Sequence, residues 1–311
     1  MKIRAVSYLN VVPVKNNTKE KTLLLIKFIE GVKRVGDHGA LYQGYDLQDC
    51  EVAMIQGWQH QRGKGGAHLM LREKVVNHQM KSNRFVCTAD SNLFLYANRG
   101  NQPHNYLRYS FNGVFPNTAQ YFDNDPDPVR WMKIKRDLNI EVGEHKTGRH
   151  ILLCLQRNGG WSMGGMDIQD WIIQTVNKIR KYSDRVIIVR PHPGDKKAHE
   201  YLNHRYNRIS NLTNVFLSDF GRSLDDDLRK CHAVVNHNSS SIVGPVIQGY
   251  PAYISDPDKS QCAEVTHHGF KDIENPKIFD RQKWLERISM FHWSFDELQN
   301  GDCWRHIREY I

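Results

Sequence analysis

The sequence predicts an α/β protein built from two Rossmann-like domains. Short apolar runs with little alternation are separated by segments of helical periodicity, as in parallel sheets covered on both faces. The length of 311 residues suits two medium domains, and the polar, glycine-containing stretch 141–149 divides the chain near its middle. We expect an amino-terminal domain over residues 1–145, a second domain over 146–290, and helices in 291–311 that pack back across the junction.

The first half shows four regular elements. Apolar runs predict buried strands at residues 51–55 (EVAMI) and 84–88 (RFVCT). Helical spacing predicts helices at 22–35 and 67–79. The aromatic stretch 93–115 has no clear period, so we assign it no element.

The second half alternates strands and helices along its whole length. Its first strand is ILLCLQ, followed by a glycine-containing loop, and its second is RVIIVR, which stops at Pro191 because proline cannot donate to a ladder. We expect strands at 151–156, 185–190, 214–217, 232–236 and 251–254, and helices at 168–179, 219–230 and 239–248.

The composition excludes several classes of protein. With 40% hydrophobic and 25% charged residues the chain is neither disordered nor a coiled coil. No apolar run approaches the ~20 residues of a membrane helix, and the first residues lack a signal-peptide core, so we expect a cytoplasmic protein. None of the six cysteines stands in a C-x-x-C pair, which argues against disulfide or zinc frameworks.

The positive charge is concentrated in the first half. Residues 1–150 hold 22 Lys and Arg against 14 Asp and Glu, a surplus of +8, whereas residues 151–311 carry +1. A basic domain attracts a polyanion such as nucleic acid or an acidic glycan. A general solubility charge explains the same surplus.

Polar residues follow three strands of the second half. Because ligands bind at the carboxyl ends of parallel strands, these residues are candidates for a ligand site. Serines at the start of a helix, with free backbone N–H groups, suit a phosphate, and the two prolines beside His192 fix its backbone. The candidates are Gln156 and Arg157 after the first strand, Arg190, His192 and Pro193 after the second, and Asn236, Ser239, Ser240 and Ser241 after the fourth.

Residues 150–260 resemble the GT-B glycosyltransferases of the capsule-polysaccharide type, and also bacterial sialyltransferases and teichoic-acid glycerophosphotransferases. The resemblance rests on the His192-Pro193 pair, on the Ser239-Ser240 pair that follows, and on the stretch VVNHNSSSIVGPVIQGYPAYI. It implies two Rossmann-like domains facing across a cleft, with a nucleotide-sugar donor held by these two pairs and an acceptor bound by the first domain. The acidic Asp/Glu-Asp/Glu-Gly motif of the sialyltransferases is absent, so the donor need not be a CMP-sugar.

The resemblance also implies that no obligatory metal is needed. The acidic run Asp123, Asp125 and Asp127 lies in a proline-containing loop and reads as a solvated turn rather than a metal site. A base must take the proton of the acceptor hydroxyl. Asp90 follows a strand of the first domain directly, so we take it as the candidate base; a capping Asp in a turn is the plain alternative.

Basic residues interleaved with aromatic ones mark the expected acceptor-binding surface. They are Arg62, Lys64, Arg72, Arg99 and Arg108. This mixture suits nucleic acid, where phosphates meet cations and an extruded base stacks on a ring. Core aromatics beside surface charges produce the same pattern.

The sequence therefore predicts a hexosyl- or pentosyltransferase that moves a sugar from a nucleotide-sugar to an acceptor hydroxyl. Because small basic GT-B enzymes resemble phage enzymes that glycosylate DNA, the first acceptor we expect is a 5-hydroxymethylpyrimidine such as hydroxymethylcytosine in DNA. An acidic capsule or cell-surface glycan is the alternative acceptor. A non-catalytic nucleic-acid-binding protein and a sugar-nucleotide epimerase are the alternatives from other classes.

Overall fold

The computed structural model describes residues 1–13, 19–58, 66–96, 105–202 and 208–311. The chain separates into two compact units. Unit 1 comprises residues 1–95, 101–139 and 285–311, and unit 2 comprises residues 96–100 and 140–284. The first unit is therefore discontinuous: the chain leaves it after Asn139 and returns at Leu285, inside the helix Gln282–Ser289 (α8).

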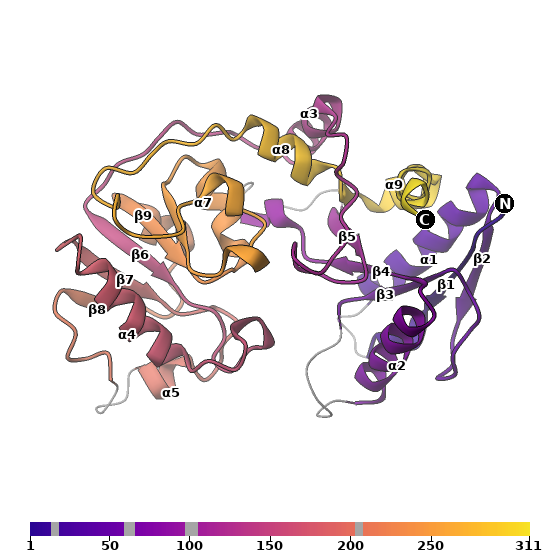
Figure 1. Ribbon diagram of the computed structural model, residues 1–311, viewed down its shortest axis with the longest axis horizontal. Helices are drawn as coiled ribbons and strands as arrows, with labels where there is room; N and C mark the ends of the chain where they lie inside the picture. The colour runs from indigo at the N-terminus through magenta and orange to yellow at the C-terminus, as the bar shows by residue number, and fades with distance from the viewer. Residues whose placement is uncertain (14–18, 59–65, 97–104, 203–207) are drawn as a thin grey trace. The chain divides into compact units, whose positions relative to one another are not determined.

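Unit 2 holds a five-stranded sheet in which every pair of neighbours is parallel. Its strand order is β10-β9-β6-β7-β8, which is the Rossmann order. The crossover from β6 to β7 and the crossover from β9 to β10 run in opposite directions across the sheet. Because both are right-handed, their helices α4 and α7 lie on opposite faces of the sheet (Figure 1). The strands are β6 (His150–Cys154), β7 (Val186–Arg190), β8 (Val215–Leu217), β9 (Cys231–Asn236) and β10 (Ala252–Ile254), and the helices are α4 (Ile168–Ile179), α5 (Ala198–Leu202), α6 (Leu224–Leu228) and α7 (Val243–Ile247).

The second-half strands lie where the apolar runs predict them. Asp167 caps α4 by accepting hydrogen bonds from the backbone N–H groups of Gln169 and Asp170, and the apolar stripe of α4 packs on the sheet. Two predicted helices are shorter than expected. The acidic segment 219–230 forms only α6, and the segment 239–248 forms a 3₁₀ turn, Ser240–Ile242, followed by the five residues of α7.

Unit 1 holds a mixed sheet of order β11-β5-β4-β3-β1-β2. The four strands from β2 to β4 are parallel, and β5 and β11 add antiparallel pairs at the other edge. The strands are β1 (Arg4–Tyr8), β2 (His38–Tyr42), β3 (Val52–Gln56), β4 (Phe85–Asp90), β5 (Leu107–Phe111) and β11 (His292–Trp293), and the helices are α1 (Lys19–Val35), α2 (Ala67–Lys81), α3 (Pro128–Asp137), α9 (Phe295–Asn300) and α10 (Asp302–Ile307).

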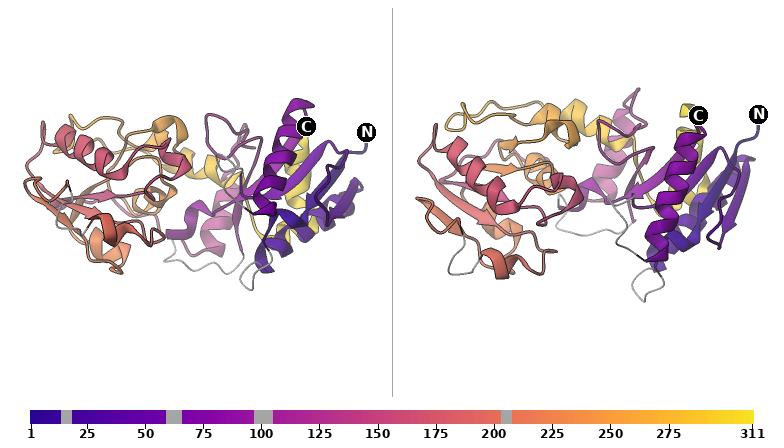
Figure 2. Two further views of the ribbon diagram at one scale, coloured as in Figure 1. Left: turned by 90° about the horizontal axis from the view of Figure 1, so that it is seen from below. Right: turned by 60° about the horizontal axis from the view of Figure 1, so that its bottom comes forward.

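Residues 285–311, which we call the closing segment, complete the layers of unit 1. Helices α9 and α10 pack against α1 on one face of the sheet, and α2 covers the other face (Figure 2). A capping box between Ser294 and Glu297 starts α9, and the Glu297 carboxylate pairs with the buried guanidinium of Arg130. Strands β1, β2, β5 and β11 are not predicted by the sequence, and β5 lies inside the aromatic stretch that we left without an element.

Candidate functional site

The sheet of unit 2 reverses its winding direction between β6 and β9. In this strand order, ligands bind outside the carboxyl ends of the two strands that flank the reversal. Gln156 follows β6 and Asn236 ends β9, so two of the predicted donor-binding residues come to this point. Both side chains are buried, at 7% and 0% exposure.

A network of amide side chains joins the two strand ends. The Gln156 side-chain nitrogen donates to the Asn238 side-chain oxygen over 2.9 Å and to the Ser162 hydroxyl over 2.8 Å. The Asn238 backbone N–H returns a hydrogen bond to the Gln156 side-chain oxygen over 3.2 Å. Asn238 was not among the predicted site residues, although it stands two places after Asn236. The network fixes both loops at the reversal point, and the Asn238 side-chain nitrogen also donates to the Asp256 carboxylate over 2.8 Å.

The Asn236 side chain brings one unsatisfied polar atom to this place. Its nitrogen donates to the backbone oxygen of Ser239 over 2.9 Å, whereas its side-chain oxygen is buried and has no hydrogen-bond partner in the described part of the chain. Buried polar atoms are nearly always paired, so an orphaned acceptor at a strand end is a feature that a bound ligand explains.

The three serines after β9 have different roles. Ser239 caps the 3₁₀ turn, because its hydroxyl accepts from the Ser241 backbone N–H, and its oxygen lies 3.0 Å from the Ser241 hydroxyl. The Ser240 hydroxyl makes no hydrogen bond within the described residues. The helix that follows is only five residues long, so the hydroxyl groups, rather than a helix dipole, are what this loop offers to a phosphate.

His192 is held in one tautomer by the turn that its two prolines create. The Gly194 backbone N–H donates to the His192 Nδ1 atom over 2.9 Å, so in the neutral ring the proton sits on Nε2. Burial lowers the pKa of His192, the Arg157 cation lowers it further, and Asp195 opposes both. His192 therefore presents a neutral N–H donor at pH 7. Pro193 is exposed in the same turn.

Asp195 ties this turn to the loop after β6. Its carboxylate accepts from the Tyr201 hydroxyl over 2.7 Å and from the Asn158 backbone N–H over 3.0 Å. Burial raises the pKa of Asp195, but these hydrogen bonds lower it by more, so the carboxylate stays charged. Asp195 stands two residues after Pro193, yet only its contacts identify it as the link between the two loops.

The two predicted arginines of unit 2 have different surroundings. Arg157 is exposed, and its guanidinium lies over Gly194, where a Cβ would come within 2.4 Å of Nη2. No ion-pair partner of Arg157 is found among the described residues. Arg190 instead donates to the fully buried Asp227 carboxylate over 2.5 Å and to the Arg222 backbone oxygen over 2.9 Å. Arg190 thus joins β7 to α6, whereas the expectation placed its charge on a phosphate.

A cavity of about 350 Å³ opens at the carboxyl end of β10. Trp171 of α4 forms part of its wall, and its indole N–H donates to the Ser255 hydroxyl, which also lies 2.7 Å from His237 Nδ1. Lys178 and Lys181 bring two cations to the lining. Burial lowers the pKa of His237, which keeps the ring neutral. Apart from His237, these residues carry no signal in the sequence.

Unit 1 holds a second cavity, of about 370 Å³, at the carboxyl ends of β3 and β4. Gln56 and Asp90, the last residues of these strands, line it together with Tyr106 and with Phe295 of the closing segment. The predicted base therefore borders a cavity large enough for a sugar ring. Glu20 and Lys21 of α1 complete the charged part of its lining.

Asp90 forms an ion pair and also lines this cavity. Its carboxylate accepts from Arg108 Nη2 over 2.5 Å and from the Ser91 backbone N–H over 2.7 Å, and its side chain is 34% exposed. Arg108 is buried on β5 and is therefore not a surface cation. Arg72 is also buried, inside α2. The predicted acceptor residues Arg62, Lys64 and Arg99 lie outside the described residues.

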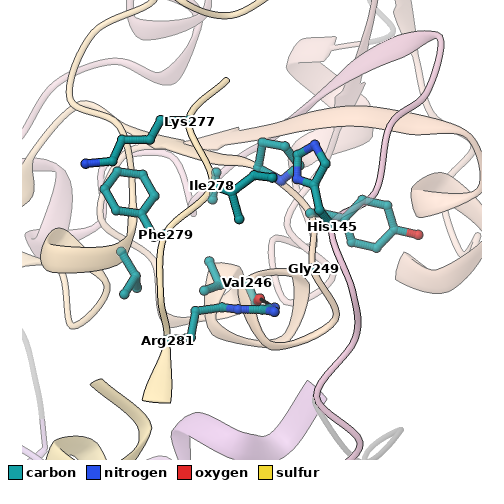
Figure 3. Close-up of a pocket in the computed structure, with 11 residues that line it drawn as sticks. His145, Val246, Gly249, Lys277, Ile278, Phe279 and Arg281 are labelled. Atoms are coloured by element: carbon teal, nitrogen blue, oxygen red, sulfur yellow. Dashed lines mark hydrogen bonds between the residues drawn. The ribbon is translucent and has the colours of Figure 1, made fainter. Parts of the chain in front are cut away.

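A third pocket lies at the opposite, amino end of β10 (Figure 3). Its volume is about 30 Å³, which is room for water but not for a sugar. The Arg281 guanidinium fills its floor by donating to the backbone oxygens of Val246 and Gly143. This pocket serves the packing of unit 2.

The described residues contain neither a metal-binding group nor a membrane-spanning helix. No group of three His, Cys, Asp or Glu side chains is placed to hold a metal ion in the part of the chain that the structure describes. Within the same residues, the helices are too short or too polar to cross a bilayer.

Two α/β units, each with ligand-type side chains or a cavity at the carboxyl edge of its sheet, define the GT-B fold class predicted from the sequence. Comparison with solved structures agrees. The chain is similar to a β-Kdo 2,4-transferase of KpsC from Thermosulfurimonas dismutans, with a TM-score of 0.55 and 12% identity over 94% of this chain and 92% of that one. It is equally similar to the β-Kdo 2,7-transferase of KpsC from the same organism, with a TM-score of 0.55 and 12% identity over 96% and 98% of the two chains.

More distant similarities add nothing to this assignment. A UDP-GlcNAc 2-epimerase of Methanocaldococcus jannaschii aligns at 12% identity over 93% of this chain and 98% of that one, but with a TM-score of only 0.36. No family model matches the sequence, and a comparison with curated proteins gives no match either. At 12% identity these similarities show the fold alone, and the expected DNA acceptor gains no support from them.

Proposed function

We propose that this protein is a glycosyltransferase of cell-surface polysaccharide synthesis, which moves a sugar from a nucleotide-sugar to a hydroxyl of a glycan. The observation that carries the proposal is the polar cluster at the point where the sheet of unit 2 reverses. There, Gln156, Asn236 and Asn238 bring neutral amides to adjacent strand ends, and the His192 and Ser240 groups are free to donate.

Unit 2 would bind the donor. As the bond between sugar and phosphate breaks, negative charge grows on the leaving phosphate. Donors already fixed in place stabilise that charge without reorganising. The His192 Nε2–H is such a donor, because the Gly194 N–H fixes its ring. The Ser240 hydroxyl and the Arg157 guanidinium, which have no partner among the described residues, would add two more. Arg190 is left out of the site, because Asp227 neutralises its charge.

The cavity beside His237 would hold the nucleoside part of the donor. Its volume of about 350 Å³ falls in the range of small-molecule pockets. The Trp171 ring in its wall offers stacking area, and Lys178 and Lys181 favour an anionic ligand.

Unit 1 would bind the acceptor in the cavity beside Asp90. The acceptor oxygen attacks the anomeric carbon, its bond to that carbon forms, and the bond from that carbon to the phosphate oxygen breaks. Asp90 takes the proton that the acceptor hydroxyl gives up. The Arg108 guanidinium, 2.5 Å from this carboxylate, holds it in place at the edge of the cavity.

A direct assay tests the proposal. The purified protein is incubated with UDP-, CDP-, GDP- and CMP-sugars, each with an acidic oligosaccharide or with hydroxymethylcytosine DNA, and products are read by mass spectrometry. We expect one sugar to be added to the oligosaccharide, with and without EDTA. Transfer to DNA alone would overturn the glycan acceptor but keep the glycosyltransferase.

A matched pair of variants separates the donor site from general folding. His192→Ala removes a group of the proposed site, and His199→Ala removes a histidine of the same unit on α5. We expect only the first to reduce transfer and donor hydrolysis, by about 10- to 100-fold. Absence of transfer, of hydrolysis and of nucleotide binding in the wild type would overturn the proposal; salt-sensitive DNA binding would then favour a non-catalytic protein.

A further inference from the structure

One arginine of unit 1 is buried without a counter-charge. Arg72 lies on the inner side of α2 and is 7% exposed. Its Nε and Nη2 atoms donate to the Val11 backbone oxygen over 3.0 and 2.9 Å, and Nη2 also reaches the Gln56 side-chain oxygen over 3.4 Å. All these acceptors are neutral.

No carboxylate lies within ion-pair distance of Arg72 among the described residues. The first turn of α2 holds no acidic residue, and Glu73, the next residue, is exposed. Burial lowers the pKa of Arg72 to about 10, which still leaves the guanidinium charged at neutral pH. An uncompensated buried charge destabilises a fold, so a bound anion is the arrangement that such a charge favours.

The position of Arg72 is that of a ligand site. The sheet of unit 1 reverses its winding between β1 and β3, and Arg72 bridges the loops after these two strands through Val11 and Gln56. Gln56 also lines the cavity that Asp90 borders. The guanidinium is therefore in contact with the wall of the proposed acceptor cavity.

The third nitrogen of the guanidinium is left to donate. Nη1 makes no hydrogen bond with the described residues. It lies against Gly57, where a Cβ would come within 2.9 Å of it, and Gly57 has a φ of +75° that side-chain-bearing residues rarely adopt. Glycine at this position therefore lets the guanidinium approach the backbone at the end of β3.

We propose that Arg72 binds an oxyanion carried by the acceptor, a carboxylate or a phosphate on a sugar, at the carboxyl edge of unit 1. That the oxyanion belongs to the acceptor rests on the proposed function, whereas the anion site itself does not. The N–H groups of Nη1 are the donors left for either group, and a charged donor strengthens such hydrogen bonds. The three segments of unit 1 hold 22 Lys and Arg against 17 Asp and Glu, and this surplus of +5 draws such a ligand toward the unit.

A purely structural role for Arg72 makes a different prediction. If the guanidinium only holds the Val11 carbonyl, its loss lowers stability but leaves the protein without any preference among charged and neutral sugars. If it binds an anion, its loss removes that preference.

The first test measures binding without catalysis. Thermal unfolding and calorimetric binding are recorded with glucuronate, glucose 6-phosphate and glucose at matched ionic strength. We expect wild type to bind one or both charged sugars roughly 10- to 100-fold more tightly than glucose, and Arg72→Gln to bind all three alike. The matched control is Lys74→Gln, which removes one charge from an exposed position of the same helix and should keep the preference.

The two charged probes distinguish the source of the oxyanion: preference for glucuronate indicates a carboxylate, and preference for glucose 6-phosphate indicates a phosphate. Equal binding of all three sugars by wild type, or a charge preference that survives in Arg72→Gln, would overturn the proposal. Should Arg72→Gln fail to fold, Arg72→Lys keeps the charge without the paired donors, and we expect it to weaken the preference about tenfold.

A transfer assay with an acidic acceptor and its methyl ester completes the design. Wild type should prefer the acid, and Arg72→Lys should lose most of that preference through KM. If no transfer occurs but the binding preference is present, the anion site stands and the proposed function fails. If transfer occurs with acid and ester equally, the proposed function stands and the anion site fails.

Discussion

Each unit carries one aspartate–arginine pair at the carboxyl edge of its sheet, and the two pairs are built in opposite ways. In unit 1 the guanidinium of Arg108 is 8% exposed and the Asp90 carboxylate 34% exposed. In unit 2 the Asp227 carboxylate is fully buried, at 0%, and the Arg190 guanidinium is 14% exposed. Asp90 borders a cavity, whereas Asp227 accepts hydrogen bonds from the Ser218 hydroxyl inside the fold.

The accessible member of each pair decides what the pair can do. A carboxylate that reaches a cavity can exchange a proton with a ligand, and its buried arginine holds it in position. A carboxylate enclosed by donors can only hold its neighbours in place. The same two residue types therefore give a candidate base in one unit and an internal support in the other.

The largest expected effect on activity comes from Asp90→Asn. An amide cannot take the acceptor proton, so we expect transfer to fall roughly 10²- to 10⁴-fold, the usual contribution of a general base. Steady-state kinetics with saturating donor measures it, and donor affinity measured by calorimetry should stay unchanged. Retention of a normal kcat would exclude Asp90 as the base.

The corresponding change in unit 2, Asp227→Asn, should act on stability. It leaves the buried Arg190 cation without its counter-charge, which costs about 3–5 kcal/mol. For a unit of this size that lowers Tm by about 10 °C. Activity per folded molecule should be preserved, and a loss of donor affinity at full folding would return Arg190 to the donor site.

His192 adds a pH test to the comparison of the two units. In the proposed donor site of unit 2 its ring acts in the neutral form. Its folded-state pKa lies below the unfolded value, so its contribution to stability is complete above about pH 6.5 and is lost as the pH falls. We expect His192→Ala to reduce transfer about 10- to 100-fold and His192→Gln, which keeps an N–H donor, to recover part of it.

Transfer by the wild type should also decline on the acid side, since protonation removes the Nδ1 acceptor that the Gly194 N–H needs. A pH profile of kcat for the three proteins checks both points. A wild-type profile that matches that of His192→Ala would contradict the role given to the ring.

The smallest effects distinguish neighbouring serines. Ser239→Ala removes the cap of the 3₁₀ turn and should lower the free energy of unfolding by about 1 kcal/mol. Ser240→Ala removes a hydroxyl without an internal partner, so stability should stay the same while donor affinity drops up to about tenfold. Chemical denaturation and calorimetry separate the two, and the reverse result would exchange their roles.

The sequence predicts unit 2 better than unit 1 for a physical reason. All five strands of unit 2 lie within one continuous segment, and burial on both faces gives uninterrupted apolar runs such as ILLC in β6. Strand β1, with the sequence RAVSY, contains polar residues, and β11 has only two residues. Such strands form because neighbouring strands are already present, and no local pattern records that.

Prediction of the candidate sites has the same limit, because contacts between distant residues leave no local pattern in the sequence. Strand-end reasoning identifies Gln156, His192 and Asn236, because a loop after an apolar run is visible in the sequence. It does not identify that Arg190 and Arg108 are neutralised, since their partners Asp227 and Asp90 are distant in the chain. The wall that Phe295 adds to the acceptor cavity depends on the return of the chain to unit 1.

That return also sets the order in which the protein can be made. A ribosome releases residues 140–284 before residues 285–311, so unit 2 can fold while unit 1 still lacks β11, α9 and α10. Until then the edge of β5 is unpaired and the apolar face of α1 is uncovered, which are features from which aggregation starts. In a nascent chain halted before Leu285, that strand edge and that helix face therefore stay open to contact with other chains.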